Sequence, residues 1–348
     1  MRYRTRPLQA AAPLAIALLI ACAPTSAPRP AVQEALTRPA AGTGLKFAVF
    51  HTEQDAFTET EKWWAQQVAE RTNGRVQVMP FYGGSLATVA ETLNAVRDGS
   101  ADLGTSAASV MSGQVPAIAP FEPMGAYPAD EQRWPAMMAQ AQPVLAQVLN
   151  RASVEYLWSQ PGPGQTAVCR GKHLKTSADY RGLKLRAAGR WQSEQVQALG
   201  AAPVTIDPGE LYLALQNGTV DCALSINSLT VSFKLYEVAP YVTQMGLAVN
   251  LAVYIVNRDT WSKLGAADRA TIQQVSAEAT NRSLPYLLGV QDSATQQLGQ
   301  LGAQLYYLTP DEQEQLLRGT TPVFDRTSQQ GGDLGAQLGR ILAEARGN

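Results

Sequence analysis

Segments with strand periodicity alternate with helical segments from the start of the globular region, and this alternation limits the fold more than any other feature. Residues 45–50 have a strand-like apolar pattern, a helical stripe around Trp64 follows, and residues 75–82 alternate as a second strand. After a helical stretch that ends at Asp98-Gly99, residues 101–106 predict a third strand. Strands joined by helices pair in parallel through crossover connections. The sequence therefore predicts an α/β sheet.

The second half of the chain repeats the alternation. Strand patterns recur at residues 154–160, 166–170, 184–186, 202–206, 220–226 and 251–257. The last ninety or so residues are mainly helical, and the middle of the chain before Met137 is Pro-rich and irregular. Two strand-like runs are separated at residues 161–165 by Pro-Gly-Pro-Gly, which suits a chain crossing between domains and is the first hinge candidate. A chain of 348 residues is long enough for two such cores.

The N-terminus has the pattern of an export signal. Arginines at positions 2, 4 and 6 precede an apolar run (10–20) that is too short to span a bilayer. Leu19-Ile20-Ala21-Cys22 resembles a bacterial lipobox, in which Cys22 is acylated and becomes the mature N-terminus; an ordinary signal peptide that contains a cysteine is the alternative. We therefore expect a signal peptide (1–21), a flexible Ala/Pro/Thr-rich tether (22–44), and a protein exported to the periplasmic or cell-surface side, held there by its lipid.

Charge and composition exclude several classes of function. The formal net charge of -1 gives no field for a nucleic acid, and we expect no nucleic-acid partner. The sequence contains no phosphate-binding GxxxxGKS loop, no GxSxG and no HExxH, and its two histidines do not favour a metal site, so we expect neither enzyme activity, nor a cofactor, nor a metal. Cys169 and Cys222 form either a disulfide or two buried thiols, because sequence gives no distance between them.

One arginine stands where a charge is costly. Arg186 ends the strand pattern of residues 184–186, and Ala187-Ala188-Gly189 then breaks the pattern before a helical stretch. A buried guanidinium requires an anionic or polar partner. Either the protein or a ligand supplies that partner.

The order of several motifs resembles that of the solute-binding proteins of tripartite ATP-independent periplasmic (TRAP) transporters, the DctP-like family. The resemblance covers nearly all of residues 45–345. It is carried by residues 73–104, by "SADYRGLKLRAAG" and "ALGAAPVTIDPGELYLALQNGTVDCALS", by "KLYEVAPYVT", and by "YIVNRDTWSKLGAADRATIQQ". The resemblance implies a two-lobed periplasmic-binding-protein-like fold, in which each lobe is a mixed sheet flanked by helices and a hinge closes an interdomain ligand cleft. It places residues 45–163 and about 252–289 in lobe I, and 164–251 and about 290–348 in lobe II.

The resemblance also implies a role for Arg186. In this family the arginine that ends the "GLK" strand clamps the carboxylate of the substrate, and a guanidinium offers two parallel donors for such a pair. The alternative is a structural salt bridge to Asp207 or Asp221. Lys184 and Arg190 are expected to be solvated surface charges.

Further ligand-binding candidates come from both lobes. The family usually has Asn four residues after the Asp of "VD"; here that position is Ser225, and Asn227 follows on the same strand face. One of the two is expected to face the ligand, and a loop-capping role is the alternative. Trp191 and Tyr212 are candidates from lobe II, each with a packing or backbone-binding role as the alternative. From lobe I, the carboxyl ends of strands suggest Phe50, His51, Thr88 and Ser106.

The implied function is capture of an organic acid and its delivery to the small and large membrane subunits of a TRAP transporter driven by an ion gradient. A second arginine found in many relatives is replaced here by Thr166, Arg170 is offset by four residues, and Cys222 stands where Gly is usual. These departures favour a monocarboxylate with a hydrophobic or hydroxylated body. The alternatives are a binding lipoprotein of an ABC importer and a ligand sensor.

Overall fold

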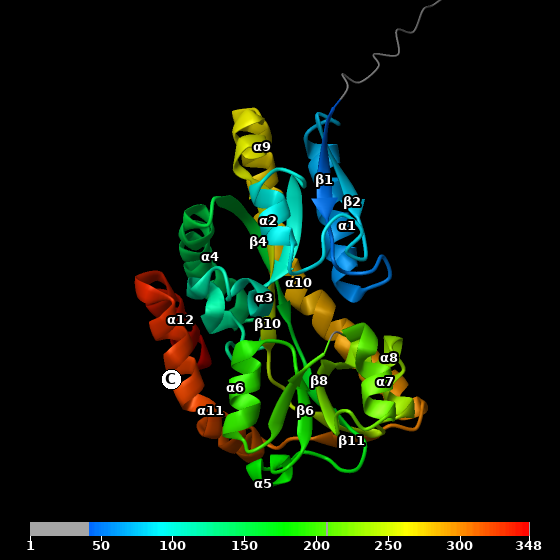
Figure 1. Cartoon of the computed structure of the whole chain (residues 1–348). Helices are drawn as coiled ribbons and strands as arrows, with labels where there is room; N and C mark the ends of the chain where they lie inside the picture. Colours follow the sequence, from blue (N-terminus) through cyan, green and yellow to red (C-terminus); the bar gives the residue numbers. More distant parts are fainter. Residues whose placement is uncertain (1–41, 207, 348) are drawn as a thin grey trace, which may run out of the picture. The chain divides into compact units, whose positions relative to one another are not determined.

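Two mixed β-sheets form the frame of the protein, as Figure 1 shows for the computed structural model, which describes residues 42–206 and 208–347. We call the five-stranded sheet with the elements packed on it lobe I, and the six-stranded sheet with its helices lobe II. Contacts hold both lobes together as one compact unit. The predicted fold class, two lobes that each contain a mixed sheet flanked by helices, is confirmed.

The sheet of lobe I has the strand order β2-β1-β3-β10-β4. Its strands are β1 (Thr43–Ala48), β2 (Val76–Phe81), β3 (Leu103–Ala107), β4 (Val154–Gly162) and β10 (Val249–Asn257). The first three run parallel, because α1 and α2 connect them, whereas β10 returns from the second half of the chain and lies antiparallel to both β3 and β4. The helical elements before β5 are α1 (Ala56–Arg71), α2 (Thr92–Arg97), α3 (Ala108–Met111), the 3-10 helix η1 (Pro116–Phe121) and α4 (Arg133–Arg151).

The sheet of lobe II has the order β11-β9-β5-β8-β6-β7. Its strands are β5 (Gln165–Cys169), β6 (Lys184–Ala187), β7 (Ala202–Thr205), β8 (Cys222–Ile226), β9 (Tyr241–Gln244) and β11 (Gln304–Tyr307). The strands β6, β7 and β8 are parallel, and β5 is antiparallel to β8 and β9. Between them lie α5 (Ser177–Tyr180), α6 (Arg190–Ala198), η2 (Pro208–Glu210), α7 (Leu211–Gln216), α8 (Asn227–Ser232) and η3 (Leu235–Glu237).

Two of the chain's passages between the lobes are neighbouring strand connections. One joins β4 to β5 and the other joins β9 to β10, and they are held together by bonds from the Gln165 N–H to the Leu247 carbonyl and from the Met245 N–H to the Gln165 carbonyl. Gly164 (φ 79°) and Gly246 (φ 64°) adopt the left-handed conformation that glycine allows. The sequence predicted a crossing over residues 161–165. The observed connection between β4 and β5 is shorter, because Pro161 and Gly162 still pair with β10 and Gln165 begins β5.

Helices from the last part of the chain bind both lobes. They are α9 (Arg258–Lys263), α10 (Ala266–Gln300), α11 (Pro310–Gln330) and α12 (Gly332–Arg346). The 35 residues of α10 extend about 52 Å, enough for this helix to pack on α1 and β4 in lobe I and on α8 and β11 in lobe II. The sequence placed residues 290–348 in lobe II, but the last helix, α12, packs on lobe I. Its buried Leu338 and Leu342 join the same core cluster as α4 and η1.

Cys169 and Cys222 form a disulfide between β5 and β8. The two residues are direct partners in the antiparallel register, and their Cα atoms are 4.1 Å apart. The sequence left this question open between a bridge and two thiols. The pairing of the strands brings the side chains together in the buried core of lobe II.

Candidate ligand-binding site

Arg186 lies in β6 near the carboxyl end of the strand and is 8% exposed. Its Nε donates to the Ile206 carbonyl at 2.8 Å, and its Nη1 donates to the Leu224 carbonyl at 3.0 Å. Two carbonyl acceptors on different segments fix the plane of the guanidinium. Asp221, one of the acids considered as its partner, accepts the Lys184 N–H at 2.8 Å, and Asp207 lies outside the described residues.

Polar side chains lie close to Arg186 at the same edge of the lobe II sheet. In the strand register, Thr166 is opposite both Ser225 and Gln244, and Arg186 is opposite Ala223, two residues before Ser225. Gln165 donates from Nε2 to the Ser225 carbonyl at 2.9 Å. The hydroxyl of Thr166 and Oε1 of Gln165 are buried and make no hydrogen bond within the described part of the chain. This edge therefore combines a cation with amide and hydroxyl groups.

Asn227, the second residue of the predicted Ser/Asn pair, is bound within the protein. Its amide exchanges two hydrogen bonds with Gln244, at 2.8 and 2.9 Å, and Nδ2 also donates to the Thr295 hydroxyl on α10 at 2.6 Å. Asn227 is 2% exposed, so it ties β9, α8 and α10 together. Ser225, on the strand before it, bonds weakly to the Ile226 carbonyl at 3.3 Å.

At the corresponding edge of lobe I, His51 belongs to a buried polar network. Its Nδ1 lies 2.8 Å from Glu61 Oε1 on α1, and the Tyr254 hydroxyl on β10 donates to the same oxygen at 2.7 Å. Gln160 on β4 donates to the Tyr254 oxygen. Burial alone would lower the pKa of His51, but the neighbouring carboxylate of Glu61, with a smaller contribution from Asp55, raises it above 6.5. The His51 imidazole and the acid group of Glu61 therefore share this buried site.

The remaining candidates occupy different environments. Phe50 packs against the His51 ring, with centroids 3.9 Å apart, and the buried Ser106 donates to the Val89 carbonyl at 3.2 Å. Thr88 is exposed, and its hydroxyl donates to Glu91 at 2.8 Å near the start of α2. Tyr212 on α7 donates to Glu237 at 3.2 Å. The structure thus gives the hydroxyls of Thr88 and Tyr212 nearby protein acceptors.

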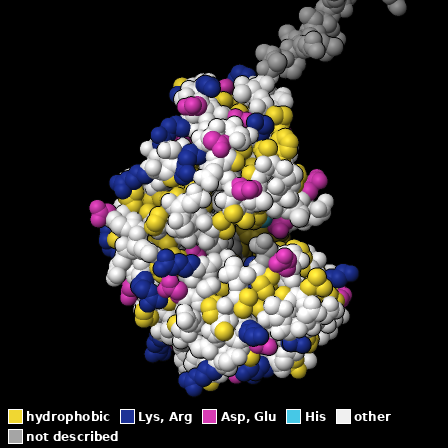
Figure 2. All heavy atoms as spheres, viewed as in Figure 1, with side chains coloured by type: hydrophobic (Ala, Val, Ile, Leu, Met, Phe, Trp, Pro, Cys, Tyr) yellow, Lys and Arg dark blue, Asp and Glu magenta, His cyan; other side chains and the backbone are white. Residues whose placement is uncertain are grey.

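Trp191 lies at the first turn of α6 and faces lobe I. Its ring packs with Ala119 and Val323, and the Arg190 guanidinium lies 4.5 Å from the ring centroid. Both residues line a cavity of about 250 Å³, together with Ser109, Val110, Ser112, Gly113, Pro116 and Gln330. A larger cavity, about 370 Å³, lies between α4 and the start of β4, and none of the predicted residues lines it. The face seen in Figure 2 is hollowed near its middle, with hydrophobic side chains inside the hollow and acidic ones at its rim.

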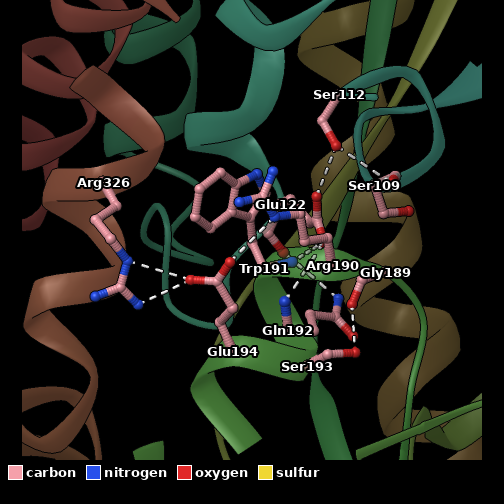
Figure 3. Close-up of polar contacts among 10 residues, drawn as sticks. All are labelled: Ser109, Ser112, Glu122, Gly189, Arg190, Trp191, Gln192, Ser193, Glu194 and Arg326. Atoms are coloured by element: carbon pink, nitrogen blue, oxygen red, sulfur yellow. Dashed lines mark hydrogen bonds and ion pairs between the residues drawn. The ribbon is translucent and has the colours of Figure 1, made fainter. Parts of the chain in front are cut away.

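Glu122, which follows η1, is a buried carboxylate beside Trp191 that the sequence analysis missed. Its Oε1 accepts the Trp191 N–H at 2.6 Å, and its Oε2 accepts the Ser112 hydroxyl at 2.9 Å, as Figure 3 shows. Burial raises the pKa of Glu122 to about 7, and the hydrogen bonds from Ser112, Trp191 and Gln192 oppose the rise. A lone acid in the apolar stretch 116–124 was the available signal. Gln165 and Gln244, which lie in β5 and β9 but outside the predicted strands, were missed as well.

Two further observations limit the chemistry of the described residues. No three of their His, Cys, Asp and Glu side chains are grouped so as to hold a metal ion. Within residues 42–206 and 208–347, no helix combines the length and the hydrophobicity that a membrane span requires. The expected signal peptide (1–21), most of the tether (22–44) and the acylation site Cys22 lie outside the described residues.

Two mixed sheets joined by short crossings, with polar groups at the joined edges, define the class of two-lobed solute-binding proteins. The chain belongs to one family of that class: residues 47–330 match the bacterial extracellular solute-binding proteins of family 7, DctP. The family resemblance inferred from the sequence motifs is confirmed. Family and fold are those of solute-binding receptors.

Three similar proteins illustrate this relationship. A solute-binding protein of Albidiferax ferrireducens is 26% identical over 183 residues, which cover 52% of this chain and 53% of the relative. A monocarboxylate 2-oxoacid-binding periplasmic protein of Nostoc sp. is 29% identical over 170 residues, 46% of this chain and 44% of the relative. The chain thus spans about half the length of these two relatives. A TRAP periplasmic solute-binding protein of Ralstonia eutropha H16, solved with bound (S)-2-acetolactate, has a TM-score of 0.76 and 24% identity, and the match covers 86% of this chain and 99% of that one.

Proposed function

We propose that this protein captures an organic acid between its lobes and that Arg186 binds the carboxylate of that acid. The observation that carries the proposal is the placement of Arg186, whose guanidinium is oriented by two backbone carbonyls at the edge of lobe II. Ser225, Thr166 and Gln165 lie at the same edge and offer hydroxyl and amide groups to the body of the ligand. A charge-assisted pair with a carboxylate is stronger than a neutral hydrogen bond.

A monocarboxylate with a hydroxyl or keto group is the substrate class that we favour. The relatives from Nostoc sp. and Ralstonia eutropha bind or hold acids of this kind. In lobe II, Thr166 replaces the second arginine that a doubly charged substrate would favour, and its buried hydroxyl can bond to a ligand oxygen. On the lobe I side, the network of His51, Glu61 and Tyr254 supplies further polar groups.

Capture requires movement of the lobes, and the two crossings supply the hinge. Gly164 and Gly246 sit in adjacent connections and tolerate backbone rotations that other residues resist. Closing the lobes over Arg186 excludes water and strengthens its pairing with the carboxylate. No bond is made or broken in this cycle, so the protein is a receptor and not an enzyme.

Delivery to a membrane transporter of the TRAP type, driven by an ion gradient, is the second part of the proposal. It rests on the family match and on the structural similarity to a TRAP binding protein. The protein would act outside the cytoplasm, exported by residues 1–21 and anchored through an acyl chain on Cys22. Uptake measured in vesicles that contain the small and large membrane subunits, with and without this protein, tests the delivery step.

A thermal-shift screen against an organic-acid library tests the capture step. A ligand at 100 times its dissociation constant should stabilise the protein by about 2.7 kcal/mol. We expect monocarboxylates among the hits and no response to the corresponding amides, because the amide lacks the charge that Arg186 binds. A set of hits made up of neutral sugars or amines would refute the proposal.

A further inference from the structure

Glu122 joins the two lobes through its side chain and is fully buried, at 0% exposure. It follows η1, whose residues Ile118 and Phe121 belong to the core of lobe I, and its carboxylate reaches the first turn of α6 in lobe II. Figure 3 shows the carboxylate between Ser112 on one side and the N-terminus of α6 on the other. The contact joins residues 69 positions apart in the chain.

The start of α6 suits a carboxylate as its partner. The helix has nine residues, Arg190–Ala198, and Gly189 before it provides no side-chain cap. Oε1 of Glu122 accepts the Trp191 N–H at 2.6 Å and the Gln192 N–H at 3.4 Å. A carboxylate from lobe I therefore caps the N-terminus of α6. Arg190, the charged group that acts on Glu122 from α6, favours the anion, and the Ser112 hydroxyl on the lobe I side donates to Oε2.

Two glutamines of α6 extend this contact along the segment. Gln195 accepts the Met124 N–H at 2.7 Å and donates to the Met124 carbonyl at 3.1 Å. Gln192 donates to the Glu122 carbonyl at 3.4 Å, while its Oε1 accepts the Ala188 N–H at 3.1 Å. The glutamine side chains of α6 thus hold the backbone of residues 122–124 against the helix. The Gln192 side chain also ties Ala188, in the loop before α6, to the helix.

The loop between β6 and α6 lies very close to lobe I. A Cβ atom on Gly189 would lie 2.5 Å from Glu122 Oε1 and 3.0 Å from both the Cβ and the carbonyl oxygen of Ser109. A side chain at position 189 would displace the Glu122 carboxylate and crowd Ser109, so glycine suits this close approach. The loop consists of Ala188 and Gly189, so it begins two residues after Arg186.

We propose that Glu122 is a positioning residue for the ligand site: by capping α6 from the opposite lobe, it holds residues 187–189, which follow Arg186, against Ser109. This inference rests on the proposed function, in which Arg186 binds the carboxylate of the ligand. Glu122 itself touches no ligand. Its effect on binding comes from fixing the backbone that carries Arg186.

The test measures the dissociation constant of the best monocarboxylate from the screen for a set of variants. Glu122→Ala removes the cap, and the loss of a hydrogen bond to a charged group predicts binding about 10-fold weaker or more. Glu122→Gln keeps an oxygen that can accept the Trp191 N–H, so its dissociation constant should stay within about 3-fold of the wild type. Glu194→Gln, at a half-buried position of the same helix where the acid pairs with Arg190 and Arg326, is the matched control and should bind as the wild type does.

A second measurement separates positioning from general stability and does not need a ligand. Amide hydrogen exchange of Trp191 and Gln192 in the ligand-free protein should be faster in Glu122→Ala and near normal in Glu122→Gln. If Glu122→Ala does not fold, Glu122→Asp replaces it, because it keeps the charge but withdraws the carboxylate by one methylene group. Wild-type affinity in the Ala or Asp variant would overturn the inference.

The outcomes also distinguish this inference from the proposed function. If the wild type binds no organic acid, or if Arg186→Ala binds normally, the proposed function fails. If Arg186→Ala loses binding while Glu122→Ala retains it, only the positioning role fails.

Discussion

Cys169 on β5 and Cys222 on β8 stand directly opposite each other and are joined by a disulfide, 53 residues apart in sequence. The bond links the central strands of the lobe II sheet, and both residues are buried. A bridge of this span restricts the unfolded chain more than the folded one.

We expect the double variant Cys169→Ser, Cys222→Ser to lose roughly 4 kcal/mol of unfolding free energy, the value that the chain-entropy relation gives for a loop of this length. Urea denaturation of the oxidised wild type and of the variant measures the difference. The wild type in reducing agent is the control, and it should approach the variant. Equal midpoints for all three samples would show that the bridge contributes nothing to stability.

Replacement of Arg186 should remove ligand binding. Arg186→Ala deletes the guanidinium. Arg186→Lys keeps the charge, but an ammonium group lacks the planar set of donors that could bond to the Ile206 and Leu224 carbonyls and to a carboxylate at the same time. We expect the Ala variant to bind at least about 100-fold more weakly and the Lys variant to fall between it and the wild type. Titration calorimetry with the best organic acid is the measurement. Arg170→Ala, at an exposed position of the same lobe, serves as the control.

The two histidines should titrate on opposite sides of pH 6.5. Burial lowers the pKa of His51, but Glu61 reverses this effect and leaves the pKa raised, whereas partial burial and Lys175 lower the pKa of His173. Imidazole NMR signals recorded against pH give both values, and His173→Gln assigns them. In Glu61→Gln the burial of His51 remains without its counter-charge, so its pKa should fall below 6.5. An unchanged His51 titration in that variant would contradict the ion pair.

Glu122 should make stability depend on pH. Its pKa is about 7 in the folded protein against an ordinary value of 4.5, so the folded state holds more protons between these values. The stabilising contribution is complete below about pH 4.5 and is lost as the pH rises through about 7, by at most about 3 kcal/mol.

The variant Glu122→Gln cannot titrate and should lack this loss, so its stability relative to the wild type should increase between pH 5 and pH 8. Urea midpoints at the two pH values measure the effect. Glu194→Gln removes a half-buried acid from helix α6 and should keep the wild-type slope. If the Gln variant keeps that slope too, Glu122 is not the group responsible.

The sequence predicted the elements better than their long-range contacts. Periodicity located the strands around residues 45–50 and 184–186, because one buried face is enough to produce that pattern. It ended β4 before Pro161, but Pro161 and Gly162 extend the strand because β10 supplies partners from about ninety residues away. The packing of α12 on α4 likewise depends on a tertiary contact that periodicity does not encode.

Only the part of the site that shows in the local sequence pattern could be predicted. Arg186 stands out locally, as a cation in an apolar strand, and the family motif gives it a role. The importance of Glu122 depends on α6 being folded against it, and the reciprocal amide bonds of Asn227 depend on Gln244 of a different strand. No local pattern reports whether a polar side chain meets the protein or a ligand.

The position of β10 within the lobe I sheet has a consequence for how this protein is made. Because β10 separates β3 from β4, the N-terminal portion of the chain cannot complete its own sheet. During synthesis the strands β5 to β9 all emerge before β10 does. The sheet of lobe I therefore stays incomplete while most of the lobe II strands are being made. This order of synthesis is compatible with the export that we propose, since lobe I cannot complete its folding until β10 has been made.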